Sequence, residues 1–162
     1  MYRRILVPVD GSHTSARGLE EAIRLAKDQR ARLRLVHVVE EYVIVQSTGL
    51  NGNGFNTGDL IDVLQAEGKK IIAKAIALAR KAGVKTDATV FESFANRSAD
   101  YIIREAKKWH ADLIVMGTHG RRGVNRLVLG SDAEIVVRTS PVPVLLVRSP
   151  ERKARAGKKK VV

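Results

Sequence analysis

Short apolar runs alternate along this chain with segments of helical periodicity. The runs typical of buried strands cover residues 4–9, 33–39, 86–92, 111–116 and 142–147. Between them, apolar residues recur at helical spacing over residues 15–30, 59–82 and 132–139, and in a segment that Ser98 is expected to cap. This alternation predicts an α/β fold, in which helices cover both faces of a parallel sheet.

Right-handed crossovers limit the orders in which such strands can lie side by side. We expect a doubly wound, five-stranded parallel sheet of order 3-2-1-4-5, with the first strand in the centre. Ligands bind such sheets beyond the carboxyl ends of the strands, at the point where the order reverses. Asp10 leaves the first strand there, and the loop that begins at Gly117 leaves the fourth. The topology therefore predicts a site built from these two connections.

Composition excludes several classes of protein. The 162 residues, 44% of them apolar, suit one domain with a substantial core. No stretch approaches the ~20 apolar residues of a membrane span, and the apolar run after Arg4 is too short for a signal segment. We therefore expect a cytoplasmic protein without membrane contact. The chain lacks cysteine and its four histidines are scattered, so we expect no disulfide and no metal held by protein ligands alone.

The net charge of +12 is unusual and is concentrated partly at the end of the chain. We expect residues 1–148 to form the domain and residues 149–162 to be a basic disordered tail, because like charges and few apolar side chains cannot offset the entropy of ordering. A basic balance attracts polyanions, although the 4% aromatic content leaves few platforms for base stacking.

The Gly-rich segment 117–131 ends directly before a helical segment. Glycines let backbone N–H groups approach a ligand, and a helix N-terminus presents unpaired N–H groups, so this combination is typical of a phosphate site. A turn with glycines for tight packing is the alternative. Asp10 is similarly open: it is either part of a turn with a helix cap near Ser12 or Ser15, or a carboxylate that binds a ribose.

The remaining motifs carry less information about function. The chain has no GxxxxGK[ST] sequence, no GxGxxG after the first strand and no aspartate at the end of the third strand, which disfavours the corresponding nucleotide and phospho-acceptor sites. His37 lies in an apolar strand and is interpreted as a core histidine. Arg121, Arg122 and Arg126 either neutralise phosphates or are solvated. No residues are spaced as a catalytic base and nucleophile.

The chain also resembles the universal stress protein family over residues 2–148. The similarity rests on the segments ILVPVDGS (5–12), LVHVV (35–39), ADLIVMGTHG (111–120), LGS (129–131) and SPVPVLLV (140–147). The ATP-binding branch of the family carries G-x2-G-x9-G-[ST], and members that do not bind ATP lack it. This chain fits the pattern without gaps, so the resemblance implies an ATP site.

The resemblance implies a role for each matching residue. It implies a ribose contact by Asp10 and a backbone contact to the adenine by Val38. It implies phosphate contacts by Gly117, Gly120, Gly130 and Ser131. It implies that the remaining members line the pocket or its edge: Pro8, Val9, Met116, His119 and Asp132. The family often has an apolar residue in place of Asp132, and a carboxylate there repels phosphates unless a divalent cation intervenes.

The expected protein is thus an ATP-binding universal stress protein that holds its nucleotide as a regulatory ligand in the stress response. ATP, ADP or AMP would bind with Mg²⁺ or Mn²⁺ through the phosphates, with slow turnover at most. One alternative is a slow ATPase, or a phosphoryl- or adenylyl-transfer enzyme of the same fold. Another is a polyanion-binding protein that acts through its tail. We also expect a homodimer through the edge strand at residues 142–147.

Overall fold

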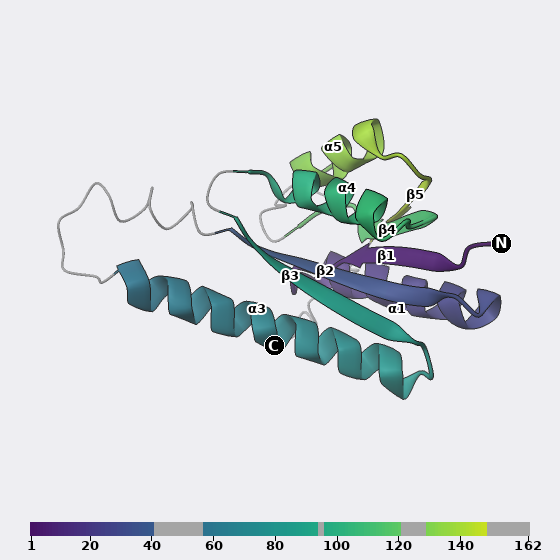
Figure 1. Cartoon of the computed structure of the whole chain (residues 1–162), viewed down its shortest axis with the longest axis horizontal. Helices are drawn as coiled ribbons and strands as arrows, with labels where there is room; N and C mark the ends of the chain where they lie inside the picture. The colour runs from purple at the N-terminus through teal and green to yellow at the C-terminus, as the bar shows by residue number, and fades with distance from the viewer. Residues whose placement is uncertain (41–56, 94–95, 121–128, 149–162) are drawn as a thin grey trace, which may run out of the picture.

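The computed structural model describes residues 1–40, 57–93, 96–120 and 129–148. They form one parallel sheet of order β3-β2-β1-β4-β5, which confirms the expected topology. The strands are β1 (Arg4–Pro8), β2 (Arg32–Glu40), β3 (Thr86–Ser93), β4 (Leu113–Gly117) and β5 (Val144–Val147). Figure 1 shows β1 at the centre of the sheet. The Gly- and Asn-rich segment 47–58 is predicted from the sequence to be a loop; its residues 57 and 58 instead begin α3, and residues 47–56 lie outside the described residues. The arginines of the Gly-rich loop and the basic tail also lie outside them.

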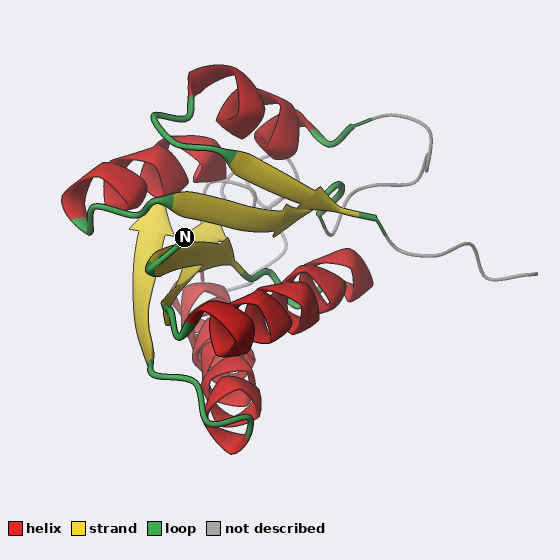
Figure 2. Cartoon of the chain, turned by 90° about the vertical axis from the view of Figure 1, so that its right-hand side faces the viewer, coloured by secondary structure: helices red, strands yellow, loops and turns green. Residues whose placement is uncertain are grey.

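Two layers of helices sandwich the sheet (Figures 1 and 2). One face is covered by α1 (His13–Gln29) and α3 (Thr57–Lys81), and the other by α4 (Ser98–Lys108) and α5 (Ser131–Thr139). Successive strand residues point to opposite faces, so Ile5 and Val7 pack under α1 and α3 while Leu6 packs under α4 and α5. Burial on both faces explains why the central strands β1 and β4 are almost continuously apolar rather than alternating.

Several boundaries differ by a few residues from the sequence expectation, and for three of them the structure shows a cause. Helix α1 begins at His13, because the Ser12 hydroxyl accepts the Ser15 N–H over 3.1 Å and caps the helix. Ser98 is the first residue of α4 rather than its cap, and its hydroxyl donates to Glu40 instead. Strand β5 begins only at Val144, because the preceding proline has no N–H to donate.

Helix α3 approaches the sheet closely at Gly68. A Cβ atom there would lie 2.9 Å from Cδ2 of His37 and 3.0 Å from Cγ2 of Val39. A glycine in the middle of a helix normally lowers helix stability, so its presence here reflects this close approach.

Within the part of the chain that the structure describes, α3 included, no helix is long and apolar enough to cross a membrane.

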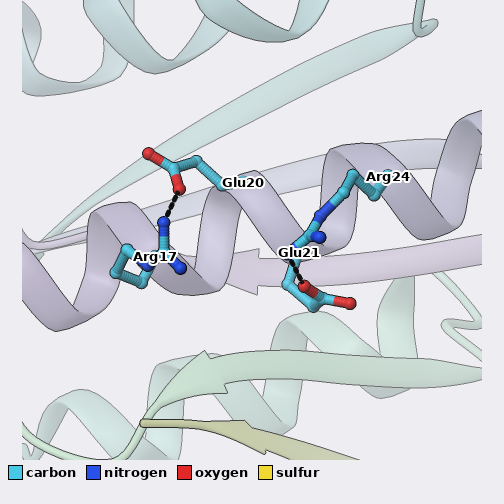
Figure 3. A network of polar contacts seen from close by, with 4 residues as sticks. All are labelled: Arg17, Glu20, Glu21 and Arg24. Carbon is cyan, nitrogen blue, oxygen red and sulfur yellow. Dashed lines mark hydrogen bonds and ion pairs between the residues drawn. The ribbon is translucent and has the colours of Figure 1, made fainter. Parts of the chain in front are cut away.

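The solvent face of α1 carries ion pairs between side chains one turn apart. Figure 3 shows Arg17 with Glu20, at 2.6 Å, and Arg24 with Glu21. All four side chains are more than a third exposed, so each pair contributes little to stability. The buried face of α1, formed mainly by Leu19, Ala22, Ile23 and Ala26, holds the helix to the sheet.

Candidate functional site

A pocket of about 520 Å³ lies beyond the carboxyl ends of β1, β2 and β4, where the strand order reverses. Parts of α3, α4 and α5 complete its wall. The residues for which the family resemblance implies a role all line this pocket: Pro8, Val9, Asp10, Val38, Met116, Gly117, His119, Gly120, Gly130, Ser131 and Asp132. The fold therefore brings together side chains that come from four separate parts of the sequence.

The Asp10 carboxylate has a fixed orientation. Its Oδ1 atom accepts the Ser12 N–H over 2.8 Å, while its own N–H donates to the Ser15 hydroxyl over 3.1 Å. Gly11 completes the turn with φ of +81°, which favours glycine. The other oxygen, Oδ2, faces Gly120, where a Cβ atom would lie 2.9 Å away. The turn interpretation therefore holds for one oxygen of Asp10, and the second lies at the pocket.

Gly117 makes a close contact that requires no ligand. A Cβ atom there would lie 2.8 Å from the carbonyl carbon and oxygen of Thr14, in the first turn of α1. The Thr14 hydroxyl also donates to the His119 carbonyl over 2.5 Å. The start of α1 therefore braces the loop that follows β4, and for Gly117 the packing interpretation has direct support.

The first turn of α5 also lines the pocket and is suited to an anion. Its N-cap is Gly130, which offers no side chain to pair with the first N–H groups of the helix. Unpaired N–H groups at a helix start and the positive end of the helix dipole both favour a bound anion. The Gly130 N–H donates to the Thr118 carbonyl over 2.9 Å, which ties this end of α5 to the residue that follows β4.

His119 presents an unpartnered nitrogen at the pocket. Its Nδ1 atom is 2.9 Å from the Thr118 hydroxyl. Its Nε2 atom is buried and makes no hydrogen bond within the described residues. An unsatisfied buried polar atom costs about 1–3 kcal/mol, which a hydrogen-bonding ligand group would offset.

His37 is the buried core histidine that the sequence suggested, and it also reaches the pocket wall. Its Nδ1 atom lies 2.6 Å from the Val9 carbonyl oxygen. A carbonyl only accepts, so Nδ1 carries the proton. This bond fixes the end of β1 directly before Asp10. Its place in an apolar strand gave no sign of the pocket contact.

Two carboxylates at the site were missed, those of Glu40 and Glu67. Glu40 ends β2, and its Oε1 atom accepts the Ser98 hydroxyl over 2.7 Å. The strand order offered a signal for Glu40, because the carboxyl end of the second strand lies at the binding edge. For Glu67, the adjacent mid-helix Gly68 was the signal, since it marks where α3 approaches β2.

The described part of the pocket wall carries acidic residues, although the chain is strongly basic. Asp10, Glu40, Glu67 and Asp132 line it, and no Lys or Arg does so among the residues described. Asp132 also has a structural contact, because its Oδ1 atom accepts the Ala99 N–H at the start of α4 over 3.3 Å. Within the described ranges, no group of three or more acidic or histidine side chains is placed to hold a metal ion.

Comparison with known proteins supports a single family. The chain matches the model of the universal stress protein family over residues 1–148. It is 36% identical over 153 residues to universal stress protein MJ0531 of Methanocaldococcus jannaschii, covering 94% of this chain and 85% of that protein. A solved universal stress protein family structure from Burkholderia pseudomallei is similar with a TM-score of 0.72 and 32% identity, covering 91% of this chain and 97% of the other.

Two more distant structures of the same fold contain nucleotides. The universal stress protein of Archaeoglobus fulgidus in complex with dAMP has a TM-score of 0.62 and 23% identity, covering 90% of this chain and 98% of its own. A universal stress protein family protein of Arabidopsis thaliana with AMP bound has a TM-score of 0.63 and 16% identity, covering 91% and 92%.

Proposed function

The chain belongs to the universal stress protein family, and we propose that its pocket binds an adenine nucleotide. The observation that carries the proposal is the convergence of three unlike features on one pocket. These are the Asp10 carboxylate, the first turn of α5 without a side-chain cap, and the unpartnered Nε2 atom of His119. Related structures with dAMP and AMP add support from the same fold.

Each part of a nucleotide has a counterpart among these residues. Oδ2 of Asp10 would accept hydrogen bonds from the ribose hydroxyls. The N–H groups at the start of α5, from Ser131 on, would bind phosphate oxygens beside Gly130, whose own N–H is bound to the Thr118 carbonyl. Nε2 of His119 would bond to another polar atom of the ligand. Val38 and Met116 would contact the base. Because the described lining is acidic, Mg²⁺ or Mn²⁺ carried on the phosphates would reduce repulsion.

We propose that ATP, ADP or AMP acts as a regulatory ligand in a cytoplasmic stress response, and that any turnover is slow. The alternative is a slow ATPase, or a phosphoryl- or adenylyl-transfer enzyme of the same fold. The two proposals predict different rates of ATP turnover. Turnover near the ~10 s⁻¹ typical of enzymes would keep the site but overturn the reading of the nucleotide as a held ligand.

Calorimetry with ATP, ADP and AMP in the presence of magnesium tests the site. Gly130→Val should abolish binding, because a side chain there would fill space beside the phosphates. Asp10→Ala should weaken binding by about 1.5–3 kcal/mol, the contribution of hydrogen bonds to a charged group. Asp87→Ala is the matched control, since Asp87 is exposed on β3 outside the pocket.

Circular dichroism must show that the variants are folded. A wild-type protein that binds none of the three nucleotides would overturn the proposal. Equal loss of affinity in Asp10→Ala and Asp87→Ala would show that Asp10 is not in the site.

A further inference from the structure

We propose that the exposed side of the C-terminal half of α3 is a docking surface for the sugar–phosphate backbone of a nucleic-acid duplex. This surface, the α3 basic face, consists of Lys69, Lys70, Lys74, Arg80 and Lys81. None of the five residues lines the pocket, so the surface is separate from the nucleotide site.

The exposed side of this part of α3 is almost entirely basic. The opposite side of the helix packs on β2 and β3, where Ile72, Ala75 and Ala79 join the core. Figure 1 shows α3 along the outside of the sheet. From residue 69 to residue 81, the exposed residues are the five members of the basic face together with Ala73, Ala77 and Leu78. At a rise of 1.5 Å per residue, the basic face extends over about 18 Å.

The charges of the basic face are not neutralised within the part of the chain that the structure describes. None of the five side chains forms an ion pair there. The sequence also has no Asp or Glu from residue 68 to residue 86. Helix α1 differs, because its arginines Arg17 and Arg24 pair with glutamates one turn away. The basic face of α3 therefore keeps its charge available for an external anion.

Stabilisation of the helix end accounts for only two of the five residues. Cations near a helix C-terminus interact favourably with the helix dipole, but the effect is confined to the last turn. Arg80 and Lys81 lie in that turn. Lys69, Lys70 and Lys74 lie about two turns or more before it, so their positions are suited to an anion that extends along the helix.

A row of cations with few apolar neighbours is suited to a phosphate backbone. Along about 18 Å of its axis, a DNA duplex carries about ten phosphate charges, and binding through counterion release needs no apolar contact. A membrane surface or an acidic protein is instead held by large apolar or aromatic side chains. Leu78, 45% exposed, is the one large apolar side chain exposed between residues 69 and 81.

The same surface offers little to a single strand. Proteins that bind single strands stack the bases on aromatic side chains. Helix α3 contains no Phe, Tyr or Trp. The contact is therefore expected with the backbone of a duplex and without preference for its sequence.

One variant removes three charges from the basic face by combining Lys70→Gln, Lys74→Gln and Lys81→Gln. These positions recur at spacings of four and seven residues, so they lie along one line of the helix. All three side chains are exposed and glutamine is a good helix former, so α3 should stay folded, which circular dichroism checks.

The matched control combines Arg17→Gln, Arg24→Gln and Lys27→Gln. It removes the same number of positive charges from the solvent side of α1, so the net charge of the two variants is equal. Any difference between them comes from the position of the charges and not from their number.

The measurement is the affinity of the full-length protein for a short DNA duplex of mixed sequence, by fluorescence anisotropy over a range of NaCl concentrations. The logarithm of the binding constant falls linearly with the logarithm of the salt concentration, by about 0.9 for each phosphate contact. The α3 variant should therefore reduce the magnitude of this slope by about 2.7, and the α1 control should leave it unchanged.

An unchanged slope in the α3 variant, or an equal reduction in the α1 control, would overturn the proposal. Absence of duplex binding by the wild type at low salt would do the same. Vesicles of phosphatidylglycerol and phosphatidylcholine test a membrane as the partner: a larger effect of the α3 substitutions on vesicle binding than on duplex binding would overturn the choice of a nucleic acid. None of these outcomes bears on the nucleotide pocket, which calorimetry tests independently.

Discussion

A Cβ atom on Gly120 would lie 2.9 Å from Oδ2 of Asp10, although the two residues are far apart in the sequence. The connection after β1, which carries Asp10, therefore lies directly against the connection after β4, which carries Gly120. Oδ1 of Asp10 is already bound by the Ser12 N–H, so the carboxylate has little room to turn away. The absence of a side chain at residue 120 therefore gives the acidic group its place at the pocket.

Gly120→Ala should consequently weaken nucleotide binding without removing any ligand contact of its own. The added methyl group displaces Oδ2 of Asp10, the atom proposed to bind the ribose. Thermal unfolding should change less than nucleotide binding, because the displaced atom is the end of a side chain rather than backbone. Calorimetry and a melting curve on the same sample separate the two effects, and unaltered affinity would contradict the prediction.

Gly117→Ala should instead act on stability, by lowering the free energy of unfolding. Its Cβ atom would meet the backbone of Thr14 at 2.8 Å, and backbone cannot move aside as a side chain can. Overpacking of this kind costs about 1–3 kcal/mol. Gly130→Ala is the comparison, because its nearest neighbour would be 3.3 Å away. Urea unfolding should show a clear loss of stability for Gly117→Ala and a smaller change for Gly130→Ala.

The buried pair of Arg34 and Glu105 should matter more than an exposed pair on the same strand. Nε of Arg34 lies 3.3 Å from Oε1 of a glutamate side chain that is only 4% exposed. Glu105→Ala leaves the arginine partly buried without its partner, and we expect a loss of about 3 kcal/mol in the free energy of unfolding.

Asp87→Ala, which breaks the exposed pair with Arg32, should cost less than about 1 kcal/mol. The single tryptophan, Trp109, reports unfolding by fluorescence, since the Arg34 guanidinium lies 5.5 Å from its ring centre. Equal losses in Glu105→Ala and Asp87→Ala would show that burial does not set the strength of these pairs.

Strand β5 is the apolar edge through which we predict a homodimer. Leu145 is 38% exposed there, whereas Val147 packs against the core. Leu145→Lys should therefore give a folded monomer, because a charge at an edge strand opposes pairing with a second copy. Sedimentation of both proteins at micromolar concentration tests this. A monomeric wild type would contradict the prediction.

Deletion of residues 149–162 should leave the melting temperature and nucleotide affinity nearly unchanged, and should weaken any binding to polyanions. The segment is rich in Lys and Arg with few apolar side chains, so it has little to bury. A large fall in melting temperature would show that it packs against the domain. Loss of nucleotide binding would favour a role for the tail in the site.

The sequence predicted the sheet order because handedness rules and the apolar runs leave few alternatives. It also predicted which connections meet, since the ends of β1 and β4 follow from that order. It did not separate the roles of the glycines. Gly117 and Gly120 belong to one motif, yet the first packs on Thr14 and the second makes room for Asp10. Such contacts depend on how α1 docks on the sheet, which no local pattern encodes.

The carboxylates of Glu40 and Glu67 were not predicted for the site, because their positions also depend on tertiary packing. Glu67 lies on a long helix whose polar residues are mostly solvated, and only the packing of Gly68 on His37 brings it to the pocket. The misplaced cap of α4 has the same origin. Ser98 looked like a cap by type, but its hydroxyl has a partner in Glu40 that is distant in sequence.

The central position of β1 has a consequence for synthesis on the ribosome. Its residues pair with β2 on one side, Ile5 opposite Leu33, and with β4 on the other, Ile5 opposite Leu113. The first strand of this sheet to leave the ribosome thus gains its second neighbour only when β4 has emerged, and until then one of its edges has no partner. The pocket cannot exist in the nascent chain before β4 emerges, so a nucleotide can assist only the final stage of folding.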